Sequence, residues 1–222
     1  MLLTNADIDH VAGLLSLREA QPFKLMATPA VHGVLRTSSA FDVLADDVVE
    51  RRDVALGTTF DLVDGVSAEI FPVPGKIALY LEKREQQETG AVATSVEGEQ
   101  TIGVELRSGD KRIVFIPGCA VMTDTLRARL EGADAVLFDG TVWQDDEMIR
   151  AGVGIKTGKR MGHMAMSGED GSMAALRGVN VGRKIYVHIN NTNPVLVEDS
   201  VERAAVEAEG WTVAHDGLSL SL

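Results

Sequence analysis

The segment TIGVELRSGDKRIVFIPG, residues 101–118, contains two apolar-rich arms on either side of the tripeptide Ser-Gly-Asp. These three residues are typical of a tight turn, so the segment predicts a β-hairpin. The helical pattern TDTLRARLEGA (123–133) follows, and the short apolar run DAVLFDG (134–140) then indicates a buried strand. A hairpin, a helix and a buried strand in this order predict an α/β or α+β fold.

The same alternation continues on both sides of this segment. Strands are expected over an opening segment that ends near residue 5 and over 23–28, 58–63, 66–75, 183–194 and short parts of 211–222. Helices are expected over 10–19, 28–36, 168–178 and 198–210, and an exposed polar loop over 82–100. The sequence shows no internal repeat and no linker, so we expect a single domain over residues 1–222.

Composition limits the class of protein. The chain of 222 residues is 45% hydrophobic and 24% charged, which is typical of a globular enzyme. A formal net charge of -12 argues against non-specific nucleic-acid binding, and no apolar run approaches the ~20 residues of a membrane helix. The single cysteine, Cys119, excludes an intramolecular disulfide and fits a reducing compartment. We therefore expect a cytoplasmic protein whose partners include neither nucleic acid nor a membrane.

The opening segment NADIDH (5–10) concentrates polar side chains. In an extended chain Asn5, Asp7 and Asp9 would share one face, and His10 would begin the following helix. Polar groups at the carboxyl end of a strand are typical of a site in an α/β protein. The alternative is that Asn5 and Asp9 only form a turn and cap the helix.

Polar residues also follow other predicted strands, and strand ends of one sheet converge in space. His163 and His188 can each be either a functional residue of the site or a structural histidine. Cys119 is interpreted as a buried, inert thiol. The motifs are VPGK, IPGC, LFDG, GKRMGH and VHINNTN, and their candidate site residues are Lys76, Cys119, Asp139, His163, His188, Asn190 and Asn191.

The segment 150–160 is basic in an acidic protein, because it has four cations and no carboxylate. It does not match a phosphate-binding loop, since the Gly-Lys pair is followed by arginine. It is either a solvated loop or a loop that attracts a carboxylate-bearing substrate. Its candidate substrate-binding residues are Arg150, Lys156, Lys159 and Arg160.

Six motifs, taken in order, resemble the pyrroloquinoline quinone (PQQ) biosynthesis protein B family, a branch of the metallo-β-lactamase superfamily. They are LLTNADIDHVAGLLSLRE, VPGK, IPGCA, LFDGT, KRMGHMAMSGEDGSMAAL and HINNTNPVL. The resemblance implies an α/β, metallo-β-lactamase-like αββα sandwich. Family members normally carry a further segment before the LLTN strand, so we expect an N-terminally incomplete sandwich. Such a short chain is expected to be less stable, to self-associate as a homo-oligomer and to be impaired in activity.

The resemblance also implies a metal site. The superfamily pattern His-x-His-x-Asp-His falls on Asn5, Asp7, Asp9 and His10 of this chain. The following metal-binding histidine of the superfamily falls near Lys76, its bridging aspartate near Cys119, and its last histidine on His188. The retained metal ligands are therefore Asp9, His10 and His188. Two histidines and one carboxylate match the facial triad of non-haem Fe(II) oxygenases, although a mononuclear Zn(II) site is also compatible.

The implied activity is oxygen-dependent hydroxylation of the tyrosine ring of a cross-linked Glu–Tyr precursor of PQQ. Asp7 and His163 are the expected acid–base residues near the metal. The alternative is a non-enzymatic carrier that helps to move PQQ or its precursor to the periplasm. A hydrolase of the parent type is disfavoured by Asn5, Lys76 and Cys119. The resemblance further implies the precursor as the bound small molecule and other PQQ biosynthesis proteins as candidate partners.

Overall fold

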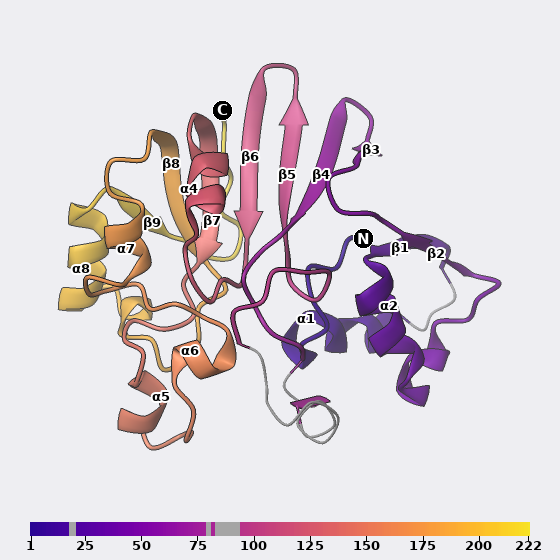
Figure 1. Cartoon of the computed structure of the whole chain (residues 1–222), viewed down its shortest axis with the longest axis horizontal. Coiled ribbons are helices and arrows are strands. Elements are labelled where there is room, and N and C mark those ends of the chain that lie inside the picture. Colours follow the sequence, from indigo (N-terminus) through magenta and orange to yellow (C-terminus); the bar gives the residue numbers. More distant parts are fainter. Residues whose placement is uncertain (18–20, 79–80, 83–93) are drawn as a thin grey trace.

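The computed structural model describes residues 1–222 except 18–20, 79–80 and 83–93. Its main element is a seven-stranded mixed sheet in the order β3-β4-β5-β6-β7-β8-β9 (Figure 1). The strands are β3 (Thr59–Val63), β4 (Val66–Pro72), β5 (Ile102–Ser108), β6 (Lys111–Ile116), β7 (Ala133–Asp139), β8 (Val181–Val187) and β9 (Trp211–Val213). The β5–β6 hairpin and the buried strand β7 confirm the expectations drawn from 101–140.

The direction of the strands determines where polar strand ends meet. Strands β3 to β6 pair antiparallel, whereas β6 to β9 pair parallel. The carboxyl ends of β6, β7 and β8 therefore lie at one edge of the sheet, and Asp139 at the end of β7 is paired with Val187 at the end of β8. In Figure 1 this edge faces α1 (Ile8–Val11) and α6 (Gly158–Met161).

A second, smaller sheet lies beside the first. Its strands β1 (Phe23–Ala27) and β2 (Val49–Asp53) pair parallel, and Leu2 forms an isolated bridge with Met26. The carbonyl of Thr4 accepts a hydrogen bond from the Ile102 amide at 2.9 Å. The first residues thus connect the two sheets, and this connection fixes the position at which α1 begins.

Helices pack against both sheets. They include α2 (Pro29–Arg36), α4 (Asp124–Leu130), α5 (Glu147–Arg150), α7 (Ser172–Ala175) and α8 (Val201–Ala208), and the 3-10 turns η1 (Ala12–Leu17), η2 (Ser39–Val43) and η4 (Pro194–Leu196). Thr28 caps α2 by accepting from the Val31 amide, as Ser and Thr do at this position. Within the described part of the chain, no helix is long and apolar enough to cross a membrane.

The opening segment differs from its prediction. Beyond the bridge at Leu2 it is not a strand, because the Asn5 side chain accepts from the Asp7 amide at 2.9 Å and turns the chain. Helix α1 then begins at Ile8, with Asp7 as its N-cap, so Asn5, Asp7 and Asp9 do not alternate along a strand face. The helix expected over 10–19 is instead α1 followed by η1, and its last residues lie outside the described chain.

Four other segments differ from what the sequence predicts. The helix expected over 168–178 spans only α7, and the segment 211–222 forms one strand, β9, at its start. Strand β2 was not predicted, because four of its five residues are charged and it has no apolar alternation. Of the loop expected over 82–100, residues 83–93 lie outside the described chain, and the remainder forms isolated bridges at Val96 and Gly98.

The largest core cluster lies between the parallel half of the sheet and its helices. It contains Leu130 of α4, Val136 and Phe138 of β7, and the rings of Tyr186 and Trp211, which stack at 4.0 Å. The buried Tyr186 hydroxyl has a partner in the Ser172 hydroxyl at 2.7 Å. This core supports the strand ends on which the polar residues stand.

Replacing Leu130 by alanine is expected to lower the free energy of unfolding by about 2–5 kcal/mol, because Leu130 is fully buried and the change leaves a cavity. The matched change at Leu196, which is 44% exposed, should cost less than about 1 kcal/mol. Urea denaturation of the two variants checks this, and equal losses would contradict the assignment of the core.

Candidate metal centre

Two elements far apart in sequence supply three potential metal ligands. Asp9 and His10 come from α1, and His188 directly follows β8. The Nε2 atom of His188 lies 2.9 Å from Oδ2 of Asp9 and 3.1 Å from Nε2 of His10. Nε2 of His10 lies 3.9 Å from the same Asp9 oxygen. The structure therefore brings together the three residues that the sequence predicted as ligands.

These separations fit one metal ion. Donors bound to a common metal at ~2.1 Å lie roughly 3.0–3.4 Å apart in octahedral or tetrahedral sites, so a small adjustment of Asp9 completes the set. The donors are also of the correct chemical type, since imidazole and carboxylate bind both zinc and iron. The group Asp9, His10 and His188 can therefore hold a metal.

The protonation of the ligands is consistent with this role. The hydrogen bond with His188 lowers the pKa of Asp9 to about 2. Burial, assisted by the nearby His188, lowers the pKa of His10. Burial also acts to lower the pKa of His188, but the hydrogen bond with Asp9 and the charge of Asp139 outweigh it and raise that pKa. Nε2 of His188 thus faces both Asp9 and His10, and a metal ion binding there would replace any proton on this nitrogen.

The backbone at His188 is in the left-handed region, with φ of 53°. Non-glycine residues adopt this conformation infrequently, and such conformations concentrate at functional sites. Here it turns the chain sharply after β8, and the ring faces α1. The conformation is a feature that the sequence motif HINNTN did not reveal.

Asp139 lies behind the three ligand residues and binds the side chains and backbone that support them. Its carboxylate is fully buried, and it accepts from the Cys119 amide, the Thr141 amide, the Thr141 hydroxyl and Nδ1 of His163, at 2.6–3.0 Å. These four donors match the four acceptor positions of a carboxylate. Burial acts to raise the pKa of Asp139, but the charge of His163 and these hydrogen bonds outweigh it and lower that pKa.

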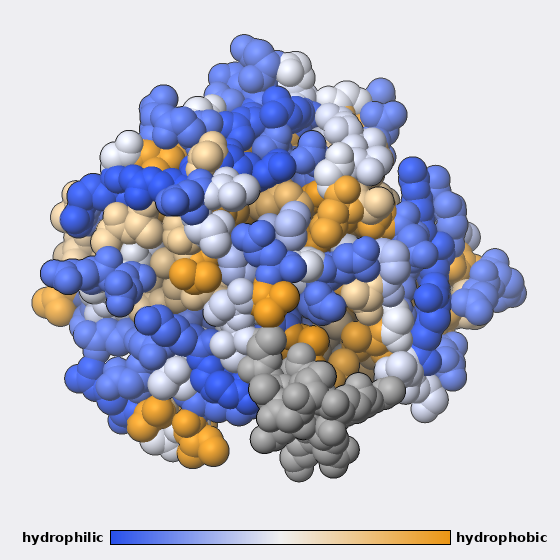
Figure 2. Space-filling model, in the orientation of Figure 1, coloured by the Kyte–Doolittle hydropathy of each residue, from blue (hydrophilic) through white to orange (hydrophobic). Residues whose placement is uncertain are grey.

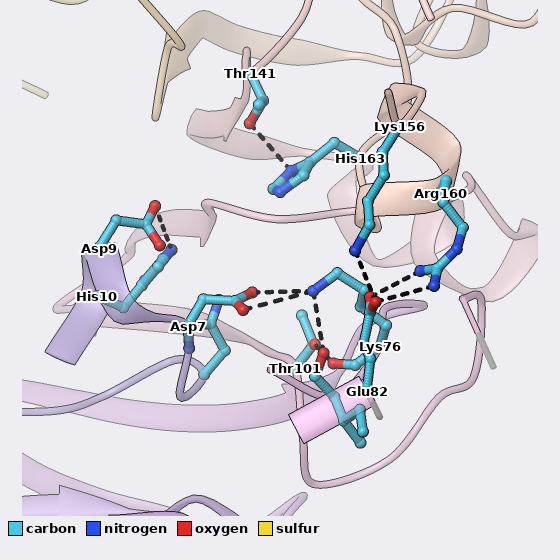
Figure 3. Close-up of polar contacts among 12 residues, drawn as sticks. Asp7, Asp9, His10, Lys76, Glu82, Thr101, Thr141, Lys156, Arg160 and His163 are labelled. Atoms are coloured by element: carbon cyan, nitrogen blue, oxygen red, sulfur yellow. Dashed lines mark hydrogen bonds and ion pairs between the residues drawn. The ribbon is translucent and has the colours of Figure 1, made fainter. Parts of the chain in front are cut away.

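Asp139, His163 and His188 also form a cluster with metal-binding atoms, but its centre is filled. The Thr141 hydroxyl lies 2.6 Å from Asp139, 3.0 Å from His163 Nδ1 and 2.8 Å from His188 Nδ1. This cluster is therefore a hydrogen-bonded support for the first group, and Figure 3 shows its contact between Thr141 and His163. Thr141 was missed by the sequence reasoning, although it follows directly on the LFDG motif.

The buried Lys76 forms an ion pair with the partly exposed Asp7 beside Asp9 and His10. The Lys76 ammonium lies 3.4 Å from Oδ2 and 3.5 Å from Oδ1 of Asp7, and it donates to the carbonyl of Ile77 at 3.0 Å (Figure 3). Gly162, with φ of 88°, packs against the aliphatic part of Lys76. A fixed cation at this position opposes a second metal ion next to the first.

The basic segment 150–160 is partly neutralised within the protein. Glu82, which is buried, accepts from Lys156 at 2.7 Å and from Arg160 at 2.7 and 2.9 Å. Arg150 pairs with Asp146 on α5. Burial acts to raise the pKa of Glu82, but the hydrogen bonds from Arg160 and Lys156 outweigh it and lower that pKa. The substrate-binding role of these cations stays a prediction.

A cavity of about 450 Å³ opens onto Asp9, His10 and His188. Apolar side chains line much of it, and Asn190 and Asn191 contribute polar groups. Its lining residues are Asp7, Ile8, Asp9, His10, Thr141, Met148, Met161, His163, His188, Ile189, Asn190 and Asn191. Asn5, Lys76, Cys119 and Asp139 are buried beneath this surface rather than on it. Burial also raises the pKa of the Cys119 thiol, which agrees with an inert cysteine.

Comparison with known proteins agrees with this geometry. Residues 1–189 match the model of the beta-lactamase superfamily domain. Coenzyme PQQ synthesis protein B of Methylorubrum extorquens is 58% identical over 222 residues, which are 100% of this chain and 72% of the relative. The chain belongs to the coenzyme PQQ synthesis protein B family. The family member from Ruegeria pomeroyi is 54% identical, over 100% of this chain and 73% of its own length.

Solved structures place this family member among metallo-β-lactamase folds. The crystal structure of Zn²⁺-bound PqqB from Methylobacterium extorquens has a TM-score of 0.94 and 57% identity, over 100% of this chain and 72% of that chain. Unliganded yeast PDE1 has a TM-score of 0.63 at 13% identity, over 97% of this chain and 66% of that chain, and shows the fold alone. The family and the α/β metallo-β-lactamase-like fold inferred from the motifs are thereby confirmed.

Replacing His188 by alanine is expected to abolish stoichiometric binding of zinc, because it removes one of three ligands. The control is His215→Ala, whose ring lies outside the site and bonds to the carbonyl of Asp216. Elemental analysis after loading with Zn(II) and gel filtration measures the metal content. Unchanged zinc in the His188 variant would refute the ligand assignment.

Replacing Glu82 by glutamine is expected to lower the free energy of unfolding at pH 7 by about 1–2 kcal/mol, because Lys156 and Arg160 lose their common buried partner. The lowered pKa of Glu82 means that its contribution is present above the unfolded pKa near 4.5 and is lost as pH falls through the folded value. The penalty should therefore shrink in acid.

Glu209→Gln is the control for this change, since Glu209 pairs with Arg177 on the surface. It should cost less than about 1 kcal/mol. Urea titrations of both variants between pH 3 and pH 7 compare the two, and a Glu82 penalty that stays constant over this range would exclude the ion-pair explanation.

Proposed function

We propose that the protein acts in PQQ synthesis as a metal-dependent enzyme, and that its reaction is oxygen-dependent hydroxylation of the tyrosine ring of a cross-linked Glu–Tyr precursor. The observation that carries the proposal is the convergence of Asp9, His10 and His188 at an open cavity. Two histidines and one carboxylate form the ligand set of non-haem Fe(II) oxygenases.

Bound iron would supply the oxygen chemistry, for which this ligand set leaves coordination positions open. The same three residues also suit zinc, and the relative from Methylobacterium extorquens was crystallised in its Zn²⁺-bound form. Zinc has no redox chemistry. The identity of the bound metal therefore distinguishes the proposed hydroxylase from a zinc protein of the same fold.

The cavity is suited to an aromatic ring. Met148, Met161 and Ile189 provide apolar surface beside the ligands, and methionine sulfur makes favourable contacts with aromatic rings. Asn190 and Asn191, at the same cavity, would bind polar groups of the precursor. The Asn190 amide already donates to Met148 and Thr192 in this structure, so its carbonyl oxygen is the group expected to accept from the precursor.

His163 is the residue proposed to accept a proton. Its Nδ1 lies 2.8 Å from the Asp139 carboxylate, so in the neutral form of the ring Nδ1–H donates to Asp139 and Nε2 carries the lone pair. The ring lines the cavity and stacks against His188 at 5.3 Å. A base in this position can accept the phenolic proton of the precursor and so increase the electron density of the ring.

Asp7, held by Lys76 from beneath the surface, is proposed to assist at the opposite wall. Figure 3 shows Asp7 on the side of Asp9 and His10, and His163 beside Thr141. Asp7 lines the cavity with its carboxylate held by Lys76. Such a fixed carboxylate can orient the α-amino groups of the precursor. Lys159 of α6 and the Glu82-linked cations Lys156 and Arg160 are proposed to attract its carboxylates, with Arg150 as a more distant member.

An exposed apolar patch is the surface that we propose for contacts with other proteins. Figure 2 shows a largely hydrophilic face with separate apolar patches, one of them over α5. The exposed large apolar residues in and directly after α5 are Ile149, Val153 and Ile155, and Ile155 is 92% exposed. This patch borders Met148 of the cavity. We propose it as the surface that other PQQ biosynthesis proteins, or a second copy of this chain, would contact.

The proposed activity is tested with protein loaded anaerobically with one equivalent of Fe(II). Adding the cross-linked precursor, oxygen and a two-electron reductant such as ascorbate should give oxygen consumption and a product heavier by one oxygen atom, measured by electrode and mass spectrometry. One oxygen atom enters the ring, and the other leaves as water with the two electrons of the reductant. Zinc-loaded protein should bind the precursor without consuming oxygen. The His163→Gln variant should keep its iron but lose about 10²–10⁴-fold in kcat, because it cannot accept the proton.

The competing function, a carrier, gives a different result. A carrier would bind PQQ or the precursor tightly with or without metal, and iron loading would produce no hydroxylated product. That outcome would refute the hydroxylase. An iron-loaded His163→Gln variant with full kcat would refute the role of His163 alone.

A further inference from the structure

We infer that Thr141 is a positioning residue for the metal centre, because its hydroxyl links the buried carboxylate of Asp139 to the ring of His188 and aims Nε2 of that ring at the metal. The inference rests on the metal site of the proposed function, but not on hydroxylation. Thr141 touches no proposed substrate group through its hydroxyl; it acts through His188.

The direction of each hydrogen bond follows from the number of protons. The Thr141 hydroxyl has one proton, and its shortest contact is with the Asp139 carboxylate at 2.6 Å. A charged acceptor takes this proton in preference to the His188 carbonyl, which lies at 3.1 Å. Toward Nδ1 of His188, at 2.8 Å, the hydroxyl is left as an acceptor. Nδ1 of His188 must then carry a proton.

This assignment fixes the opposite nitrogen of the ring. A histidine that donates through Nδ1 binds a metal through Nε2, and such a bond to a second residue orients many metal-bound histidines. In this chain Nε2 of His188 is the atom within 3.1 Å of both Asp9 and His10. The Thr141 hydroxyl therefore selects the nitrogen that completes the ligand set.

Two further observations show why His188 needs this support. Its backbone φ of 53° places the ring by a turn that most residues avoid, so the ring is not held by a regular strand. The hydroxyl, in contrast, is attached to a rigid part of the fold. Thr141 is 7% exposed and stands two residues beyond the end of β7, where its own amide donates to Asp139 at 3.0 Å.

Asp139 reaches the two histidines by different routes. It accepts directly from His163, but it reaches His188 only through Thr141. Removing the hydroxyl therefore affects the two histidines differently. His163 keeps its carboxylate partner, whereas His188 loses the acceptor of its Nδ1 proton. A general loss of packing would affect both histidines, so this difference between them can be used to test the inference.

The test uses Thr141→Val, which removes the hydroxyl at nearly constant shape, and Thr141→Ser, which restores it. Zinc affinity is measured by competition with a chromophoric chelator under anaerobic conditions without substrate. Thr141→Val should bind zinc about 10–100-fold more weakly, and Thr141→Ser should stay within about threefold of the wild type. The control is Thr192→Val, whose hydroxyl bonds to Glu147 rather than to a ligand.

A second readout is the ring N–H signals of zinc-loaded protein labelled with ¹⁵N-histidine. The wild type should show slowly exchanging Nδ1–H signals from both His163 and His188. Thr141→Val should lose the His188 signal and keep that of His163. This spectrum of the wild type tests the inference even where Thr141→Val does not fold.

The outcomes separate the inference from the proposed function. Wild-type zinc affinity in a folded Thr141→Val variant, or a His188 ring protonated at Nε2 in the zinc-loaded wild type, would overturn the inference. A wild type that binds no zinc would overturn the metal centre together with it. A wild type that binds metal as described but consumes no oxygen would overturn the hydroxylation alone.

Discussion

The buried carboxylate of Asp139 is the group on which the arrangement of the site depends. A fully buried charge is tolerated only when its acceptor positions are filled, and here four donors from three segments fill them. The Cys119 amide belongs to the loop after β6, and His163 to the loop after α6. The carboxylate therefore holds these loops together, and it fixes the protons of both histidines at the cavity.

The parallel half of the large sheet determines where the Asp139 carboxylate lies. Strands β6, β7 and β8 are parallel, so their carboxyl ends present Cys119, Asp139 and His188 at one edge of the sheet. The first residues of the chain bring Asp9 and His10 to the same edge, because Leu2 pairs with Met26 and Thr4 with Ile102. Both the ligands and their support thus depend on backbone pairing outside the site.

Much of this could be predicted from sequence, for identifiable reasons. The hairpin at 101–118 and the buried strand at 134–140 have clear periodicity, and Asp9, His10 and His188 are ligand types within recognisable motifs. Strand β2 could not be predicted, because its charged residues carry no apolar signal and its pairing with β1 is a tertiary contact. Thr141 and Glu82 escaped notice for a similar reason: a hydroxyl or a carboxylate gains its role from distant partners. The residues at Asn5 are compatible with a strand or a turn, and the hydrogen bond from the Asp7 amide to the Asn5 side chain favours the turn.

The contact between His10 and His188 joins residues 178 positions apart in the chain. An ion held between them would be a tether between the first helix and the end of β8. Local unfolding of α1 would release the ion even if the large sheet stayed folded. The rate at which the metal is lost would therefore measure the local stability of the N-terminal region. Conversely, free metal would favour the state in which the chain's beginning is docked, by mass action. Supply of the ion would thus act as a folding ligand for the N-terminal region, in addition to any chemistry it performs.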